Sequence, residues 1–281
     1  MVDTYTLNNG IEIPKIAFGT WQLEEGDVAY KSVAKALELG YRHIDTAQVY
    51  GNENSVGQAI QDSGIDRQDI FLTTKVWNDK GSYEATKLSI DESMKKLKVD
   101  YLDLLLIHWP NPKEFQANDG WKERNAHVWK AMEEYYQAGK VKAIGVSNFL
   151  EHHLEELLKT ATVKPQVNQI KLSPGLSQDE LVAYCRQHDI LLEAYSPLGK
   201  GEIFSDNDLK TLAEKYNRTV AQLALQWSLQ HGFLPLPRSQ NPVNIESNLQ
   251  VGDFELAAED MEAMDQIEGL VAAPDPDHAS F

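Results

Sequence analysis

Several features that define other classes of protein are missing from this sequence of 281 residues. It contains a single cysteine, Cys185, which rules out an internal disulfide, and the helical pattern around it predicts a buried, unreactive thiol. No stretch approaches the roughly 18 continuous apolar residues of a membrane-spanning helix, and the opening MVDTYTLNNG has neither a basic start nor an apolar core. We therefore expect a cytoplasmic protein with no membrane partner.

Positive charge is also scarce, because 26 Lys and Arg residues stand against 43 Asp and Glu residues, for a net charge of −17. Nucleic acids and anionic lipids bind dense clusters of Lys and Arg, so neither is expected as a partner. An anionic cofactor can still bind where a few cations gather in one pocket. A G-x-G-x-x-G motif between a strand and a helix, the usual dinucleotide cradle of doubly wound dehydrogenases, is absent.

What is present is a regular alternation of strand and helix patterns. Asn9-Gly10 forms the predicted turn of a short N-terminal hairpin, and eight apolar runs follow it, separated by segments with apolar residues every three or four positions. The runs cover residues 16–19, 41–45, 70–75, 101–107, 141–146, 166–170, 190–194 and 233–237. Eight βα units predict a parallel sheet closed into a (β/α)₈ TIM barrel of one domain, residues 1–281. An open, doubly wound sheet is the structural alternative.

The helical segments carry their own boundary signals. Glycines occupy positions where helices are expected to end, and the pattern from Asp208 to Gly232 reads as one continuous helical segment. The glycines are Gly40, Gly64, Gly139 and Gly232. The last residues, AAPDPDHASF, predict a short tail that crosses the surface.

Polar or aromatic side chains follow each apolar run, at the barrel end where the βα loops converge and active sites form. A single residue of this kind usually caps a helix or meets solvent, but eight positions together predict a functional mouth. Those residues are Trp21, Asp45, Lys75, His108, Ser147, Asn148, Gln169, Tyr195, Ser196, Arg238 and Ser239.

Asp45 and Lys75 each end an apolar strand, where an unpaired charge is costly, so we expect them to pair. A lysine kept charged in this way favours the phenolate of a neighbouring tyrosine and would lower its pKa toward neutrality. Tyr50, five residues after Asp45, is the candidate proton donor, and His108 is a second donor that could orient a carbonyl oxygen. A surface tyrosine and a core histidine are the alternative interpretations.

The ordered motifs of this chain resemble those of the aldo-keto reductase family along almost its whole length. They are YRHIDTAQVYGNENSVG (41–57), LTTKVWN (72–78), LLLIHWP (104–110), GKVKAIGVSNF (139–149), QVNQI (166–170), AYSPLG (194–199), TVAQLALQWSLQHG (219–232) and LPRSQNPVNIESN (236–248). The resemblance indicates the bacterial and fungal branch, such as the diketo-gluconate reductases, which acts on small aldehydes, dicarbonyls and keto sugars. It implies hydride transfer from a nicotinamide cofactor without a metal.

The resemblance also assigns roles to residues, beginning with a catalytic tetrad of Asp45, Tyr50, Lys75 and His108. It implies that the nicotinamide is held by Ser147, Asn148, Gln169 and Tyr195, the pyrophosphate by the loop containing Ser196, Leu198 and Gly199, and the adenosine by Arg238, Ser239 and Asn248. The substrate walls would be Trp21, Trp77 and Trp109 beside Tyr50 and His108, whereas Trp121 and Trp129 read as helix packing. Because the tail is short, the pocket is expected to be open and the protein a monomer.

The chain departs from the family pattern at the adenosine end. Members that prefer NADPH usually carry Lys-Ser and, five residues after the serine, an arginine, where this chain has Arg238, Ser239 and Asn244. We therefore predict that NADPH is favoured over NADH less strongly than is usual. Glu246 is interpreted as a solvated helix residue, although a carboxylate there would suit the free ribose hydroxyl of NADH.

Two other functions compete with this interpretation. His43 and Asp45 lie on one strand face with His108 two strands away, as in a metal-dependent barrel hydrolase, but Lys75 would then point a cation at the metal. A reductase-like barrel that senses the cofactor with little turnover is the second alternative.

Overall fold

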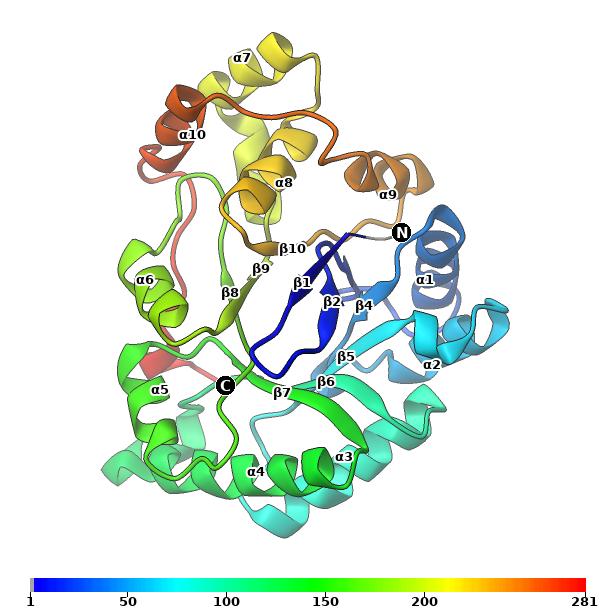
Figure 1. Ribbon diagram of the computed structural model, residues 1–281, viewed down its shortest axis with the longest axis vertical. Coiled ribbons are helices and arrows are strands. Elements are labelled where there is room, and N and C mark those ends of the chain that lie inside the picture. Colours follow the sequence, from blue (N-terminus) through cyan, green and yellow to red (C-terminus); the bar gives the residue numbers. More distant parts are fainter. Residues whose placement is uncertain (1–2) are drawn as a thin grey trace.

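Eight parallel strands form the centre of the computed structural model, which describes residues 3–281 (Figure 1). They are β3 (Phe18–Gly19), β4 (His43–Asp45), β5 (Phe71–Val76), β6 (Leu102–Ile107), β7 (Val141–Ser147), β8 (Val167–Lys171), β9 (Leu191–Tyr195) and β10 (Leu234–Leu236). Each strand pairs with the next one in the sequence. Backbone hydrogen bonds from Ala17 N to Pro235 O (3.1 Å) and from Gly19 N to Pro237 O (3.0 Å) join the first strand to the last. The predicted barrel is confirmed, and the open sheet is excluded.

Helices surround the barrel on its outside (Figure 1). They are α1 (Asp27–Leu39), α2 (Glu53–Asp62), α3 (Tyr83–Leu97), α4 (Gly120–Gln137), α5 (Glu151–Leu158), α6 (Asp179–Gln187), α7 (Asn207–Tyr216), α8 (Val220–Gln230), α9 (Pro242–Leu249) and α10 (Ala258–Asp265). Gly40 ends α1 in the left-handed conformation with φ 112°, and the other three predicted glycines also have positive φ directly after their helices. Among residues 3–281, no helix is both long enough and apolar enough to span a bilayer.

The helical segment predicted over residues 208–232 is two helices. Asn217 adopts the left-handed conformation (φ 51°) and ends α7. Thr219 then begins α8, because its hydroxyl accepts a hydrogen bond from Gln222 N while the Gln222 side chain accepts one from Thr219 N. Local capping chemistry therefore interrupts a hydrophobic pattern that continues across the break.

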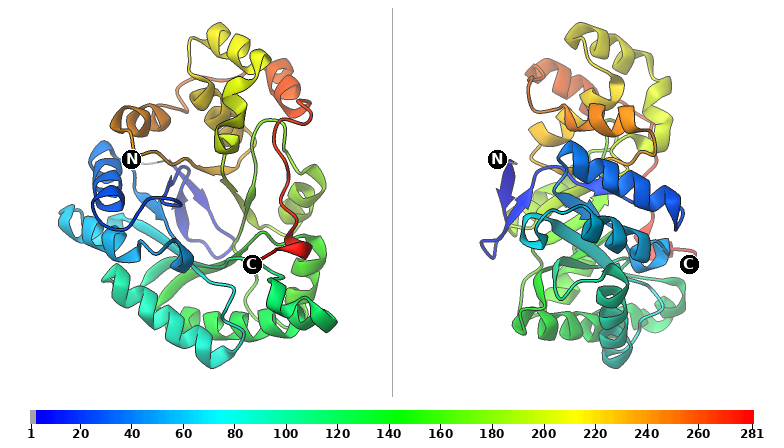
Figure 2. Two further views of the ribbon diagram at one scale, coloured as in Figure 1. Left: turned by 180° about the vertical axis from the view of Figure 1, so that it is seen from behind. Right: turned by 90° about the vertical axis from the view of Figure 1, so that its right-hand side faces the viewer.

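The two ends of the barrel differ. The predicted hairpin forms as β1 (Thr4–Thr6) and β2 (Glu12–Pro14), and it closes one end of the barrel (Figure 1). Leu7 and Ile13 from this hairpin pack with barrel-interior residues such as Leu104 and Leu236. Figure 2 shows the hairpin and residue 281 on opposite sides of the molecule. The end of the barrel away from the hairpin receives the carboxyl ends of the strands, and the candidate site lies there.

Candidate functional site

A buried ion pair lies at the centre of this end. Lys75 on β5 places its Nζ 2.7 Å and 2.8 Å from the two carboxylate oxygens of Asp45, the last residue of β4, and 2.9 Å from Thr46 O. Lys75 is fully buried and Asp45 is only 3% exposed. The predicted pairing is confirmed, and each charge compensates the other in a region without solvent.

Tyr50 lies beside this pair at the end of a short 3₁₀ helix, Gln48–Tyr50. Its hydroxyl oxygen is 3.4 Å from Lys75 Nζ, as the sequence predicted. The predicted lowering of its pKa is wrong in direction: burial raises the pKa of Tyr50, and the lysine opposes this rise without overcoming it. The phenol is therefore protonated at neutral pH and can act as a proton donor.

His108 follows β6 directly and completes this group. Its ring meets the Tyr50 ring edge to face, with 5.7 Å between the centroids. Burial, with smaller contributions from the charges of Lys75 and Arg124, holds the pKa of His108 well below its ordinary value. The imidazole is therefore neutral, and a neutral ring can donate one hydrogen bond to a substrate oxygen without adding charge.

The geometry argues against the metal-site alternative. Both Asp45 oxygens contact the Lys75 ammonium, a cation that a metal ion would have to displace. His43 Nε2 is instead 2.8 Å from Thr73 Oγ1, and the His43 ring packs edge to face on Phe71 near the hairpin end. His43, Asp45 and His108 therefore do not form a coordination site.

Ser147, Asn148 and Tyr195, three residues predicted to hold the nicotinamide, are hydrogen-bonded in series, and Asn148 also binds the backbone of His108. Asn148 Nδ2 donates to His108 O (3.0 Å), and the Tyr195 hydroxyl donates to Asn148 Oδ1 (2.7 Å). Ser147 Oγ donates to Gln169 O (2.8 Å). These contacts fix the side chains at the ends of β7 and β9 next to His108, and their binding of a nicotinamide stays a prediction.

The side-chain amide of Gln169 bridges two buried carboxyl groups, a contact that the sequence did not indicate. Its Nε2 donates to Asp45 Oδ2 (2.9 Å) and also to Glu193 Oε2 (2.7 Å). Both N–H groups of the amide thus have acceptors, and Oε1, which has no hydrogen-bond partner among residues 3–281, could accept a hydrogen bond from a nicotinamide carboxamide.

The residues predicted for the rest of the cofactor lie along β10, α9 and the loop after β9. Ser196 is left-handed (φ 48°) and leads through Leu198 into the 3₁₀ segment Gly199–Ser205. Arg238 is exposed and donates to Gln22 Oε1 (2.8 Å), and no acidic side chain among residues 3–281 forms an ion pair with it. Its guanidinium is therefore available to an anionic ligand. Ser239 and Asn248 are buried, whereas Asn244 and Glu246 are exposed on α9.

Two of the three predicted pocket tryptophans, Trp77 and Trp109, lie beside His108. The Trp77 ring is 5.2 Å from the His108 ring, centroid to centroid. Phe281 stacks on Trp77 at 5.8 Å and meets Trp109 edge to face at 5.0 Å. Trp21 instead lies under the Lys200 ammonium and is 40% exposed, so its substrate role remains a prediction. Trp121 and Trp129 are buried against helices, as predicted.

The C-terminal tail is hydrogen-bonded to the loop after β6, in addition to crossing the surface as predicted. Lys113 N donates to Phe281 O (3.1 Å), and Gln116 Nε2 donates to Ala279 O (2.9 Å), so the tail is bound to the loop after β6. Sequence analysis missed Phe281 because no local pattern shows which distant loop a tail will contact.

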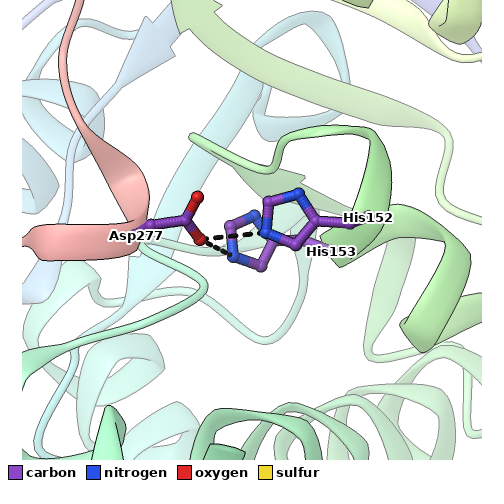
Figure 3. A group of neighbouring side chains, drawn as sticks. All are labelled: His152, His153 and Asp277. Carbon is purple, nitrogen blue, oxygen red and sulfur yellow. Dashed lines mark hydrogen bonds and ion pairs between the residues drawn. The ribbon is translucent and has the colours of Figure 1, made fainter.

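A histidine pair on α5 also binds this tail (Figure 3). His152 Nε2 and His153 Nε2 lie 2.9 Å and 3.0 Å from the same oxygen of Asp277. These three residues have the spacing of metal ligands. However, His153 Nδ1 accepts a hydrogen bond from Leu150 N (3.1 Å), which leaves the proton of the neutral ring on Nε2, the nitrogen that lies 3.0 Å from Asp277 Oδ1. A ring in this tautomer cannot coordinate a metal through Nε2, so the cluster fastens the tail.

Arg124 is another residue that the sequence analysis missed. It is 1% exposed on α4, and its guanidinium donates to the carbonyl oxygens of Trp109 (3.0 Å) and Trp77 (3.3 Å). Burial lowers its pKa to about 10, so it remains charged at neutral pH. One buried cation therefore connects the two loops that carry Trp77 and Trp109.

Comparisons with known proteins agree with this geometry. The model of the Aldo/keto reductase family matches residues 15–269. The chain is 44% identical to a glyoxal reductase of Bacillus subtilis, covering 99% of this chain and 98% of the relative. It is 43% identical to a glycerol 2-dehydrogenase (NADP(+)) of Hypocrea jecorina, covering 94% and 91%.

A solved structure leads to the same conclusion. The aldo-keto reductase of Bombyx mori, crystallised in complex with NADP, superimposes with a TM-score of 0.88 at 34% identity, covering 98% of this chain and 95% of that chain. Sequence and fold therefore agree over nearly all of residues 3–281. The chain belongs to the aldo/keto reductase family.

Proposed function

We propose that the protein reduces small aldehydes, ketones or keto sugars with NADPH and that Tyr50 donates the proton to the carbonyl oxygen. The observation that carries this proposal is the contact of Lys75 Nζ with both Asp45, at 2.7 Å, and the Tyr50 hydroxyl, at 3.4 Å. A buried cation held by a carboxylate and placed against a protonated phenol is suited to stabilise the phenolate that forms when the proton leaves.

Each residue of the site has a separate role in the proposed reaction. Asp45 keeps Lys75 charged, Lys75 stabilises the developing phenolate of Tyr50, and neutral His108 donates a hydrogen bond that orients the substrate oxygen. When bound, the nicotinamide cofactor supplies the hydride. Asn148, Tyr195 and the free Oε1 of Gln169 would hold its nicotinamide ring. The indole rings of Trp77 and Trp109 with Phe281 exclude water beside the reacting carbonyl.

NADPH is the proposed cofactor because Arg238 offers an exposed guanidinium, with no acidic partner among residues 3–281, and Ser239 offers a hydroxyl for the 2′-phosphate. The names of two matched proteins include NADP, which supports the same choice. Asn244, exposed on α9, supplies no second cation, so NADH is expected to be accepted as well.

Small substrates are favoured by the relatives and by the pocket walls. Two matched proteins are named for glyoxal, which has two carbons, and for glycerol, which has three. Trp77, Trp109 and Phe281 pack on one another close to His108, which leaves an aromatic wall beside the proposed proton donor. A panel of aldehydes and keto sugars of increasing size, followed through cofactor absorbance, tests this assignment and also separates an enzyme from a cofactor-sensing barrel.

The test of the mechanism is Tyr50→Phe, which keeps the ring and removes only the transferable proton. We expect kcat to fall by roughly 10²-fold or more, while the NADPH affinity measured by fluorescence titration changes little. Tyr184→Phe on α6, whose ring packs on His188 away from the site, is the matched control and should leave both quantities unchanged. Near-normal turnover by Tyr50→Phe would refute the role of Tyr50.

We also propose that the protein works as a monomer in the cytoplasm, without nucleic-acid or membrane partners. The net charge of −17 supports this, because such a surface repels polyanions and other copies of itself. Light scattering after size exclusion should give a mass near 31.7 kDa, and a mass of twice that value would contradict the monomer.

A further inference from the structure

A second buried carboxyl group lies next to the proposed catalytic pair. Glu193 on β9 is 0% exposed, and its Oε2 accepts a hydrogen bond from Gln169 Nε2 at 2.7 Å. Its other oxygen, Oε1, has no hydrogen-bond partner within residues 3–281. Burying a carboxyl group costs free energy, and the cost is greater when one of its oxygens has no hydrogen-bond partner.

Glu193 is connected to the proton donor through an uninterrupted series of polar contacts. Gln169 Nε2 bridges Glu193 and Asp45 with distances of 2.7 Å and 2.9 Å. Asp45 in turn binds Lys75 at 2.7 Å, and Lys75 Nζ lies 3.4 Å from the Tyr50 hydroxyl. Because the two N–H groups of Gln169 each have an acceptor, the amide cannot turn over without losing both bonds.

Burial and the charge of Asp45 favour the uncharged form of Glu193 and outweigh the opposing effects of Lys75 and of the hydrogen bond from Gln169. Asp45 faces it from β4, Lys75 from β5 and neutral Gln169 from β8, while its register partner on β10 is the apolar Leu234. If both carboxyl groups were ionised, this buried region would hold two negative charges and one positive charge. Burial, reinforced by the charge of Asp45, raises the pKa of Glu193 to about 8, so most molecules hold it protonated at pH 7.

We propose that Glu193 is a positioning residue of this reductase: an uncharged carboxyl group that fixes the Gln169 amide against Asp45 and thereby sets the Asp45–Lys75 pair beside Tyr50. This inference rests on the proposed function, because it concerns the proton that Tyr50 donates. When Glu193 ionises at alkaline pH, its negative charge near Lys75 opposes the formation of the Tyr50 phenolate. Proton donation, and with it reduction, should then become slower.

Two substitutions separate the hydrogen bond of Glu193 from its charge. Glu193→Gln keeps an acceptor for Gln169 and cannot ionise, whereas Glu193→Leu removes the acceptor. Aldehyde reduction would be followed in single turnovers with saturating NADPH from pH 6 to 9.5, so that cofactor release does not limit the measured rate. Thermal unfolding of each variant would establish that it is folded.

Glu193→Gln should change the pH dependence of the rate, whereas Glu193→Leu should lower the rate itself. The wild-type rate should fall as pH rises through about 8, while Glu193→Gln should match it within about twofold at pH 6.5 and lack this fall. Glu193→Leu should be at least about tenfold slower at every pH, because Gln169 and Asp45 lose their fixed orientation. Fluorescence titration of NADPH should show weaker binding to Glu193→Leu than to Glu193→Gln, since Gln169 is one of the residues that would hold the nicotinamide.

Two results would overturn the proposal. One is an alkaline fall in Glu193→Gln identical to that of the wild type, and the other is a normal single-turnover rate in a folded Glu193→Leu. Tyr50→Phe is measured in the same series. Loss of activity in Tyr50→Phe together with unchanged Glu193 variants would refute the role of Glu193 alone, whereas retained activity in Tyr50→Phe would refute the proposed function itself.

Discussion

Replacing Lys75 with methionine tests the buried ion pair on which the proposed mechanism depends. Methionine fills a similar volume but removes the ammonium, which eliminates the contacts to both Asp45 oxygens and to Thr46 O. Asp45 is 3% exposed, so in the variant its charge is buried with only Gln169 as a hydrogen-bond donor from the original set. Breaking a buried pair by removing one partner costs about 3–5 kcal/mol.

The expected loss is large enough to measure in two independent ways. For a chain of this size, a loss of 1 kcal/mol lowers Tm by about 2–4 °C, so Lys75→Met should unfold roughly 6–20 °C below the wild type. Reduction at pH 7 should slow by roughly 10²-fold or more, because the Tyr50 phenolate loses its neighbouring cation. Differential scanning calorimetry and steady-state kinetics provide the two measurements.

The double variant Asp45→Asn, Lys75→Met is the matched control, because it removes both charges together. It should recover most of the lost Tm and remain inactive, which separates the electrostatic cost in the folded state from the catalytic role of Lys75. A single variant destabilised by less than about 1 kcal/mol, or a double variant no more stable than the single one, would refute this reasoning. Borohydride trapping with a carbonyl substrate should leave no adduct on Lys75, since its role is that of a charge and not of a Schiff base.

Two further predictions concern the cofactor and the tail. Asn244→Arg should raise the kcat/KM ratio of NADPH to NADH by about ten- to a hundredfold, since it adds a charge-assisted contact of about 1.5–3 kcal/mol, and an unchanged ratio would contradict the role given to this position. Burial lowers the pKa of His153 to about 4 from an ordinary value near 6.5. The unfolded chain therefore binds this proton first, and stability should be lost as pH falls from about 6.5 toward 4. His153→Gln, which keeps an acceptor for Leu150 N, should make Tm less sensitive to pH in this window, and an unchanged slope in calorimetry would exclude His153 as the cause.

The barrel and the Asp45–Lys75 pair could be predicted from the sequence because both follow from local patterns and topology. Short apolar runs that alternate with helical periodicity specify a parallel barrel, and the polar residue after each run must then lie at the same end. Asp45, Lys75 and His108 are far apart in the sequence, but Asp45 ends β4, Lys75 lies one residue before the end of β5, and His108 directly follows β6. The closed sheet then brings them together without further information from the loops.

Charge states could not be predicted in the same way. The pKa of Tyr50 was expected to fall because Lys75 is near, but the phenol is buried, and desolvation outweighs the cation. Glu193 was hidden within an apolar run, where the pattern ILLEA indicates only a strand. Its contacts depend on which side chain lies beside it on the neighbouring strand, and the register that pairs Gln169 with Glu193 is a property of the folded sheet.

The walls of the substrate pocket show the limit of sequence reasoning most clearly. Trp77 and Trp109 lie on separate loops, and their positions depend on a buried guanidinium, Arg124, that a helix pattern gives no reason to single out. Phe281 reaches the same two rings because His152 binds Asp277, a residue 125 positions away in the sequence. Because residues remote from the reacting atoms hold these aromatic walls, substitutions in the tail or on α4 should alter the choice of substrate while the contacts of Lys75 with Tyr50 stay intact.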